Sequence, residues 1–215
     1  MVDTSLFDIC KRALSELALS ASVEQIEKTV SYLELLNKWN KVHNLTAVKS
    51  AEEMVFRHIL DSLSIAPYLH GSRIADVGSG AGLPGIPLAI FSPACEFTLI
   101  ESANKRVQFL RQVIHRLALS NVRVIHSRVE NVSESTAFHS VVTRAFAKLP
   151  KMLQLIQHLC DNQSKILAMK GDAALDEISQ LPNWVSMEAV IPLTIPTKDW
   201  QHYLLVIRKT TSFKD

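Results

Sequence analysis

A run of glycines behind an acidic residue is the strongest chemical signal in the chain: Asp76-Val77-Gly78-Ser79-Gly80-Ala81-Gly82. Glycines adopt positive φ angles and let the backbone approach a ligand closely. Dinucleotide-binding folds use Gly-x-Gly-x-x-Gly, which brings a pyrophosphate to a helix N-terminus. Here the spacing is Gly-x-Gly-x-Gly, and a carboxylate at Asp76 would repel a pyrophosphate. The pattern favours a cationic ligand without phosphate, such as S-adenosylmethionine, over NAD; a purely structural turn is the third interpretation.

Polar residues also follow the second and third predicted strands. Glu101 comes after the second strand, where a carboxylate can accept hydrogen bonds from both ribose hydroxyls of an adenosine ligand. Arg128-Val129-Glu130 follow the third strand, where the backbone can reach an adenine ring and Val129 can cover its face. A solvated acid and a plain turn are the alternative interpretations of these two segments.

Arg144 ends the fourth predicted strand, beside the expected donor site, where a substrate would be held. A guanidinium there stacks on a base, binds a phosphate, or forms an ordinary structural ion pair. The sequence contains no Asn-Pro-Pro-Tyr run, with which amino-group methyltransferases accept an exocyclic amine, and no positioned cysteine nucleophile. This absence argues for an acceptor atom that already carries a free lone pair. Arg144, which would hold the base or its phosphate beside the donor, is the predicted catalytic residue.

The predicted secondary structure that must hold these residues changes at Arg73, from helices alone to alternating strands and helices. Before it, helical spacing of apolar residues predicts helices over about 4–19, from Ser22 onward and over about 50–66, with capping boxes formed by Ser22 with Gln25 and by Ser50 with Glu53. After it, short apolar runs alternate with helices, which implies parallel pairing. The expected strands are 73–77, 97–100, 122–126, 140–143, 165–169, 187–192 and 203–208, the last pair antiparallel. The predicted fold is α/β: a mostly parallel, doubly wound, seven-stranded sheet over 71–215 behind an N-terminal helical region, 1–70.

The composition limits the classes of protein to which the chain can belong. The chain has 215 residues, of which 47% are hydrophobic and 20% charged, as in ordinary globular proteins. The three cysteines form no Cys-x-x-Cys pair, and the histidines lack metal-ligand spacing, so we expect no metal. No apolar run approaches the roughly 18 residues that span a bilayer, and no secretory signal opens the chain, so we expect a cytoplasmic protein. The net charge is +2, with the excess of basic residues after residue 70.

Six segments occur together in one order. They are Trp39-Asn40 with Asn44-Leu45-Thr46; Arg57-His58 with Asp61-Ser62-Leu63; the glycine run extended by Leu83-Pro84-Gly85-Ile86-Pro87-Leu88-Ala89; Lys105-Arg106 with Phe109-Leu110; Arg128-Val129-Glu130; and Arg144-Ala145-Phe146-Ala147. Together they closely resemble the family of bacterial small-subunit (16S) ribosomal RNA guanine-N7 methyltransferases called RsmG, or glucose-inhibited division protein B. The resemblance spans nearly the whole chain.

The resemblance implies a class I S-adenosylmethionine-dependent methyltransferase fold, which is Rossmann-like, with an N-terminal helical extension. It implies methyl transfer to N7 of one guanine in the decoding-region hairpin of 16S ribosomal RNA, presented as naked RNA or in the small-subunit particle. By family similarity the donor contacts fall on Gly78, Leu83, Val129, Glu130 and Arg144, to which methyltransferases in general add Asp76, Gly80 and Glu101. No extended interface pattern stands out, so a monomer is expected.

Guanine N7 carries an in-plane lone pair and no proton, so its attack needs no general base and catalysis is mostly alignment. Because N7 lies in the deep major groove of paired RNA, the target must be unpaired or splayed out. The candidates for RNA contact are Lys105, Arg106, Arg57, His58 and Lys170. A solvated helix face and an i, i+4 pair of Arg57 with Asp61 are the ordinary alternatives for these basic residues.

Two alternative functions stay open. One is a methyltransferase acting on another RNA or a small molecule, and the other is a nucleotide-binding oxidoreductase.

Overall fold

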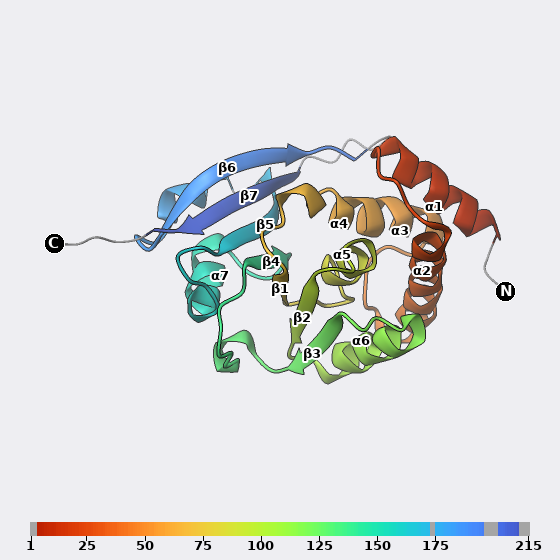
Figure 1. The fold of residues 1–215 in the computed structure, drawn as a ribbon, viewed down its shortest axis with the longest axis horizontal. Coiled ribbons are helices and arrows are strands. Elements are labelled where there is room, and N and C mark those ends of the chain that lie inside the picture. Colours follow the sequence, from red (N-terminus) through yellow and green to blue (C-terminus); the bar gives the residue numbers. More distant parts are fainter. Residues whose placement is uncertain (1–3, 173–174, 196–201, 211–215) are drawn as a thin grey trace.

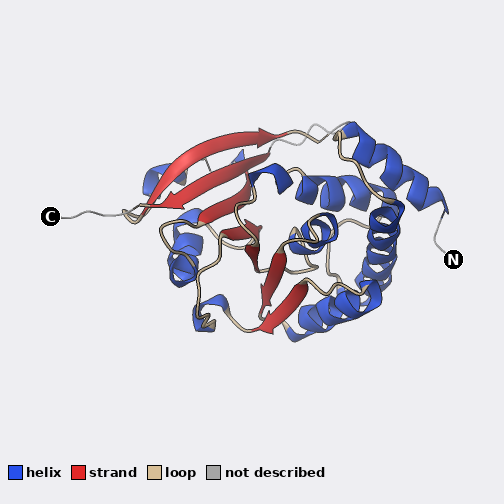
Figure 2. Ribbon diagram, in the orientation of Figure 1, coloured by secondary structure: helices blue, strands red, loops and turns tan. Residues whose placement is uncertain are grey.

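The computed structural model describes residues 4–172, 175–195 and 202–210. A seven-stranded sheet with strand order β3-β2-β1-β4-β5-β7-β6 lies at its centre (Figures 1 and 2). The strands are β1 (Arg73–Val77), β2 (Glu96–Glu101), β3 (Val122–His126), β4 (Ser140–Arg144), β5 (Lys165–Gly171), β6 (Val185–Leu193) and β7 (His202–Lys209). Each of the seven predicted strands overlaps one of them.

The sheet is parallel from β3 to β5, and β7 runs antiparallel to both β5 and β6. The prediction of one reversed strand is therefore confirmed. β1 is central: Ile74 pairs with Phe97 of β2 on one side and with Ser140 of β4 on the other. Since the chain changes sides of β1 between β3 and β4, the carboxyl ends of β1, β2 and β4 surround a crevice at this switch point.

Helices flank the sheet. The α-helices are α1 (Thr4–Glu16), α2 (Val23–His43), α3 (Ala51–Met54), α4 (Asp61–Leu63), α5 (Gly85–Phe91), α6 (Asn104–Leu117) and α7 (Leu149–Ile156). Short 3-10 turns occupy Ala66–Tyr68, Val129–Asn131, Gln157–Leu159 and Ile178–Gln180. A π-helical turn, Val55–Leu60, joins α3 to α4, so the helix expected over 50–66 is interrupted. The alternation of strands and helices also predicts a helix between β3 and β4, near Val132, where the structure has only the 3-10 turn Val129–Asn131.

The predicted capping boxes have different outcomes. At α2 the box is complete, because the Ser22 hydroxyl accepts from the Gln25 amide at 3.2 Å and the Gln25 side chain accepts from the Ser22 amide at 2.9 Å. At α3 the Ser50 hydroxyl accepts from the Glu53 amide at 3.3 Å, as predicted. The Glu53 carboxylate instead pairs with Arg57 Nε at 2.9 Å.

The two faces of the sheet have separate hydrophobic cores, because neighbouring side chains of a strand point to opposite faces. Ile74, Leu99 and Val142 face the layer formed by α1 to α6. Val77 and Val141 face α7. Figure 1 shows α7 on the opposite side of the sheet from α5 and α6.

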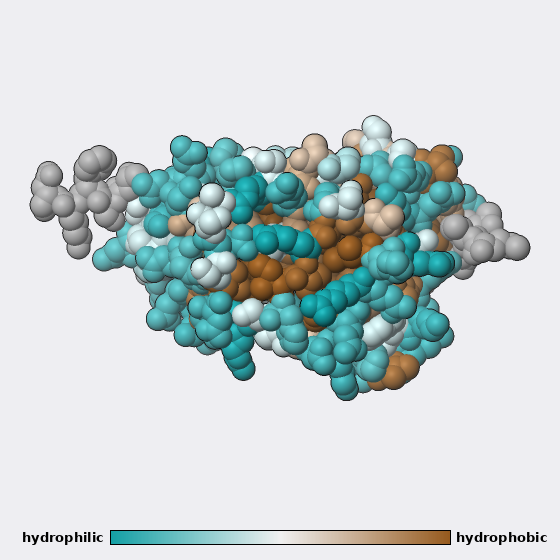
Figure 3. All heavy atoms as spheres, turned by 60° about the horizontal axis from the view of Figure 1, so that its bottom comes forward, coloured by the Kyte–Doolittle hydropathy of each residue, from teal (hydrophilic) through white to brown (hydrophobic). Residues whose placement is uncertain are grey.

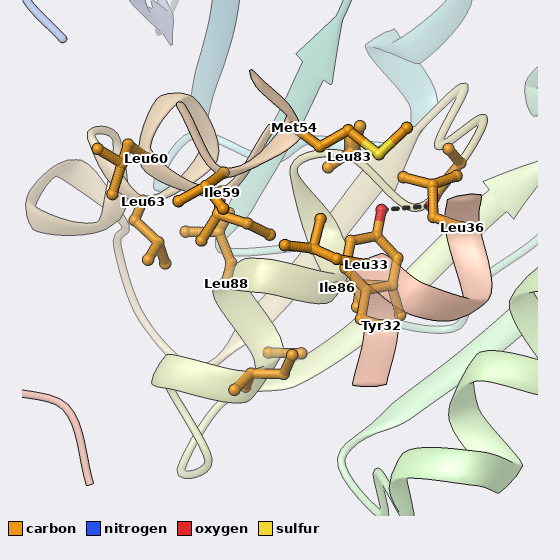
Figure 4. Close-up of a cluster of buried hydrophobic side chains, with 14 of the residues drawn as sticks. Tyr32, Leu33, Leu36, Met54, Ile59, Leu60, Leu63, Leu83, Ile86 and Leu88 are labelled. Atoms are coloured by element: carbon orange, nitrogen blue, oxygen red, sulfur yellow. Dashed lines mark hydrogen bonds between the residues drawn. The ribbon is translucent and has the colours of Figure 1, made fainter. Parts of the chain in front are cut away.

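The helices before β1 are part of the larger core. Tyr32 and Leu33 of α2 and Met54 of α3 are fully buried and pack with residues of α5 in one cluster (Figure 4). The same cluster extends along this face of the sheet to Leu204 of β7. Residues 4–70 therefore form a helical layer that shares its core with the sheet.

The surface is mostly polar. Figure 3 shows one face on which apolar side chains gather in a hollow surrounded by hydrophilic ones. Among the described residues, the exposed large apolar side chains are Val23, Val42 and Val190. Within the same part of the chain, every helix is too short or too polar to cross a membrane.

Candidate active site

Two pockets adjoin at the carboxyl ends of the parallel strands. The first, here the glycine-loop pocket, has a volume of about 380 Å³ and is lined by residues that include Gly78, Glu101, Arg106, Val129, Glu130, Ala145, Phe146 and Lys151. The second, here the Arg144 pocket, has a volume of about 480 Å³ and is lined by Thr46, Ala47, Val48, Arg57, His58, Asp61, Arg144, Ala145, Met169, Lys170, Gly171 and His202. Ala145 lines both. The strand β4 thus ends between two spaces of small-molecule size.

The glycine loop requires glycine at its first position. Gly78 has φ +72°, and a Cβ atom there would lie 2.5 Å from the Phe146 ring. The Gly78 amide donates to the Ile100 carbonyl at 2.9 Å, which ties the loop to the end of β2. Gly80 also has a positive φ of +58°, but a Cβ there would meet only the Gly78 carbonyl at 3.8 Å. The backbone of Gly78 can therefore form part of the pocket wall without a side chain in the way.

Glu101, at the end of β2, faces this loop. One carboxylate oxygen accepts from the Gly80 amide at 2.9 Å, and the other accepts from the amides of Ser102 at 2.9 Å and Ala103 at 2.8 Å. Arg106 Nη1 lies 3.7 Å from the first oxygen. This carboxylate is fixed in place at a pocket wall and retains acceptor capacity for hydroxyl groups. The lining includes the carboxylates of Glu101 and Glu130 and the apolar side chain of Val129, which are groups that suit an adenosine ligand.

Asp76 lies beneath the loop and lines neither pocket. Alternation along β1 puts it on the face that α5 covers, where its Oδ2 accepts from the Gly85 amide at 3.0 Å and its Oδ1 has no hydrogen-bond partner among the described residues. Burial raises the pKa of its carboxyl to about 7, although the Gly85 amide opposes this shift. In this structure Asp76 therefore holds the start of α5, and its contact with the donor stays a prediction.

Leu83, expected to contact the donor, lies in the hydrophobic cluster with Met54 and Leu33 (Figure 4). It is 7% exposed and lines neither pocket. The neighbouring Ala81 carbonyl accepts a 2.8 Å hydrogen bond from the fully buried Tyr32 hydroxyl. The helix α2 therefore holds the glycine loop from behind. The sequence gives no sign of this contact, because Tyr32 has the spacing of an ordinary core residue.

Arg144 is held by the N-terminal helical layer. Its Nη1 donates to Asp61 Oδ2 at 2.7 Å and to the Arg57 carbonyl at 3.1 Å, and its Nη2 lies 3.2 Å from His58 Nδ1. Asp61 Oδ1 in turn contacts His202 Nε2 of β7. Arg144 is thus both in an ion pair and at a pocket wall, so a structural ion pair is compatible with contact to a base or a phosphate.

The predicted RNA-contact residues lie in different surroundings. Arg57 lines the Arg144 pocket and pairs with Glu53, and Lys105 is exposed at the start of α6. Lys170 donates to the Ala147 carbonyl, and burial lowers the pKa of its ammonium. His58 is only 3% exposed, and burial together with Arg144 lowers the pKa of its imidazole to about 4. A neutral, buried imidazole is suited to holding Arg144 rather than to binding a phosphate.

Several site residues were not among the predicted ones. Phe146, Asp61, Thr46 and His202 line the pockets or hold residues that do. Phe146 could have been found from its place after a strand end, whereas His202 lies on the reversed strand and gives no such signal. Among the described residues, no group of three or more His, Cys, Asp or Glu side chains is arranged to hold a metal ion.

Solved structures share this architecture at low sequence identity. The magnesium protoporphyrin IX methyltransferase ChlM from Synechocystis PCC 6803, solved with bound S-adenosylmethionine, matches with a TM-score of 0.57 and 14% identity over 83% of this chain and 97% of its own. An S-adenosylmethionine-dependent methyltransferase from Aquifex aeolicus matches with a TM-score of 0.56 and 11% identity over 71% and 91%. At such identities the likeness shows the fold, a class I methyltransferase fold as predicted.

Sequence comparison is more specific. The model of the family described as rRNA small subunit methyltransferase G (GidB) matches residues 25–205. The ribosomal RNA small subunit methyltransferase G of Enterobacter sp. (strain 638) is 45% identical over 92% of this chain and 95% of its own length. The protein of the same name from Salmonella arizonae is 46% identical over 92% and 95%. From these matches we conclude that the chain belongs to the rRNA small subunit methyltransferase G family.

Proposed function

We propose that this protein transfers a methyl group from S-adenosylmethionine to N7 of one guanine in 16S ribosomal RNA of the small ribosomal subunit. The observation that carries the proposal is the pair of pockets that meet at Ala145, one walled by the glycine loop and Glu101, the other by Arg144. The name of the family indicates ribosomal RNA of the small subunit as the substrate, and the resemblance of the motifs indicates guanine N7 as the methylated atom.

The glycine-loop pocket is the proposed site of the donor. Glu101, already fixed by three backbone amides, would accept hydrogen bonds from ribose hydroxyls. Val129 would lie against the adenine, and the bare backbone of Gly78 would admit the rest of the ligand. When bound, the cofactor supplies an electrophilic methyl group on a sulfonium.

The Arg144 pocket is the proposed site of the target guanine. Its walls carry the cationic side chains of Arg57, Arg144 and Lys170, which suit a phosphate-bearing ligand. The base would have to leave its stack to enter. N7 needs no deprotonation, so the residues here have to orient the base and its phosphates rather than move a proton.

The assembled small-subunit particle and naked RNA remain two candidate forms of the substrate, and we propose a monomeric enzyme acting on either. The test is to incubate the purified protein with S-adenosylmethionine carrying a labelled methyl group and with each form of the RNA, prepared from cells that lack the modification. We expect label at N7 of a single guanine.

Titration calorimetry with S-adenosylmethionine and NADH tests the alternative function, since an oxidoreductase would bind NADH alone.

A further inference from the structure

Two N-terminal segments, one with Asn40 and Thr46 and the other with His58, are joined to Arg144 by a continuous chain of hydrogen bonds. Its last link is the 3.2 Å contact of Arg144 Nη2 with His58 Nδ1. On the other side of the ring, His58 Nε2 lies 2.9 Å from the Thr46 hydroxyl. The ring therefore has one partner on each nitrogen.

Thr46 is itself fixed. Its amide donates to Asn40 Oδ1 at 2.8 Å, and its hydroxyl accepts from the Val48 amide at 3.1 Å. Asn40 also donates from Nδ2 to the Val48 carbonyl at 3.2 Å, which closes the loop onto α2. The chain of contacts thus runs from α2 through the π-helical turn to the end of β4.

The partners of the ring determine its tautomer. A guanidinium has donors only, so the nitrogen that faces Arg144 must accept, and a neutral ring then carries its proton on Nε2, toward the Thr46 hydroxyl. The charged groups around the ring agree with a neutral state: Arg144 from β4 and Arg57 from the same turn are cationic, and the Asp61 carboxylate is shared between Arg144 and His202 of β7.

We propose that His58 is a positioning residue, which Thr46 holds as the Nε2–H tautomer so that Nδ1 accepts from Arg144 and orients its guanidinium in the pocket. This proposal adds to the proposed function and rests on it only where methylation turnover is measured. The tautomer itself is independent of the reaction.

The first measurement is therefore spectroscopic. In ¹⁵N-resolved spectra of the wild-type protein near neutral pH, we expect His58 Nε2 to be protonated and Nδ1 unprotonated. An Nδ1–H tautomer, or a cationic ring, would overturn the assignment even if the enzyme methylates RNA. Conversely, wild-type protein with the expected tautomer but no RNA methylation would reject the proposed function alone.

The second measurement uses paired variants. Thr46→Val should lower kcat roughly tenfold, an effect typical of removing a group that orients another site residue. The Kd for S-adenosylmethionine should change less than about twofold. Thr46→Ser should recover most of that loss. His58→Asn, which offers an acceptor oxygen near Nδ1, should retain more turnover than His58→Leu at equal thermal stability. Equal turnover in the two His58 variants, or an unchanged kcat in Thr46→Val, would contradict the positioning role.

Discussion

Arg144 and Asp61 are 83 positions apart in the chain, yet Nη1 of one lies 2.7 Å from Oδ2 of the other. The pair joins the end of β4 to the start of α4, and both side chains are largely shielded, with 22% and 11% exposed. The helical layer therefore supplies part of the wall of the proposed acceptor site. The layer positions a residue of the site, in addition to stabilising the core.

Asp61→Asn tests this relationship. We expect it to lower the free energy of unfolding by about 1–3 kcal/mol, since a partly buried charge loses its counter-ion, and to lower kcat. Urea unfolding and steady-state methylation measure the two effects. Asp8→Asn, on the exposed side of α1, is the charge-matched control. An Asp61→Asn enzyme with wild-type kcat would show that the ion pair has no part in turnover.

Arg144→Ala should abolish methyl transfer, and its effect on the reaction rate should be larger than its effect on folding stability. The guanidinium lines the pocket, so its removal takes away a group that would orient the base, whereas the hydrophobic cluster on either side of the sheet is unchanged. Single-turnover methylation and thermal unfolding of the same sample separate the effects. Near-normal turnover would end the proposed role of this residue.

Glu101→Gln should weaken binding of S-adenosylmethionine by about 10- to 100-fold, which corresponds to the roughly 1.5–3 kcal/mol of a hydrogen bond to a charged group. Titration calorimetry gives the Kd directly. Glu96→Gln, at the exposed opposite end of the same strand, should bind like the wild type. If both variants bind equally well, the ribose contact is absent.

Tyr32→Phe removes one buried hydrogen bond and little volume. The Ala81 carbonyl loses its partner, so we expect a loss of about 1 kcal/mol in unfolding free energy and a few-fold higher Kd for S-adenosylmethionine, because the glycine loop loses its support from α2. Tyr68→Phe, at a half-buried tyrosine in the turn before β1, is the control. Unchanged stability in Tyr32→Phe would mean that the loop is held by its own backbone.

Asp76 should make stability depend on pH. Because burial raises the pKa of its carboxyl from 3.8 to about 7, the folded state holds this proton more tightly than the unfolded state does. The contribution is complete below about pH 4 and is lost as the pH rises to about 7. Asp76→Asn removes this titration, so the stability of the variant relative to the wild type should increase from pH 5 to pH 8. Parallel stability curves from urea unfolding would contradict the raised pKa.

The sheet could be predicted because its strands are short apolar runs next to recognisable helices. The bounds predicted for β1 and β3 are those observed, and the lone reversed strand followed from the missing helix between the last two runs. The glycine loop and Glu101 could be placed for the same reason, since strand ends of a parallel sheet share one edge.

The contacts between distant segments could not be predicted. The spacing of Arg57 and Asp61 suggested a local helix pair, but Asp61 pairs with Arg144, and Arg57 pairs with Glu53. The π-helical turn that contains the buried His58 could not be predicted either, since helical periodicity gives no sign of it. The sequence also did not indicate that Asp76 accepts a hydrogen bond from the Gly85 amide at the start of α5.

Mapping of 7-methylguanosine in the small-subunit RNA of the source organism tests the central proposal most directly. RNA from a strain in which this gene is deleted should lack the modification at one guanine of the decoding-region hairpin. A plasmid copy of the wild-type gene should restore it, and an Arg144→Ala copy should not. Full N7 methylation of that hairpin in the deletion strain would contradict the proposed function.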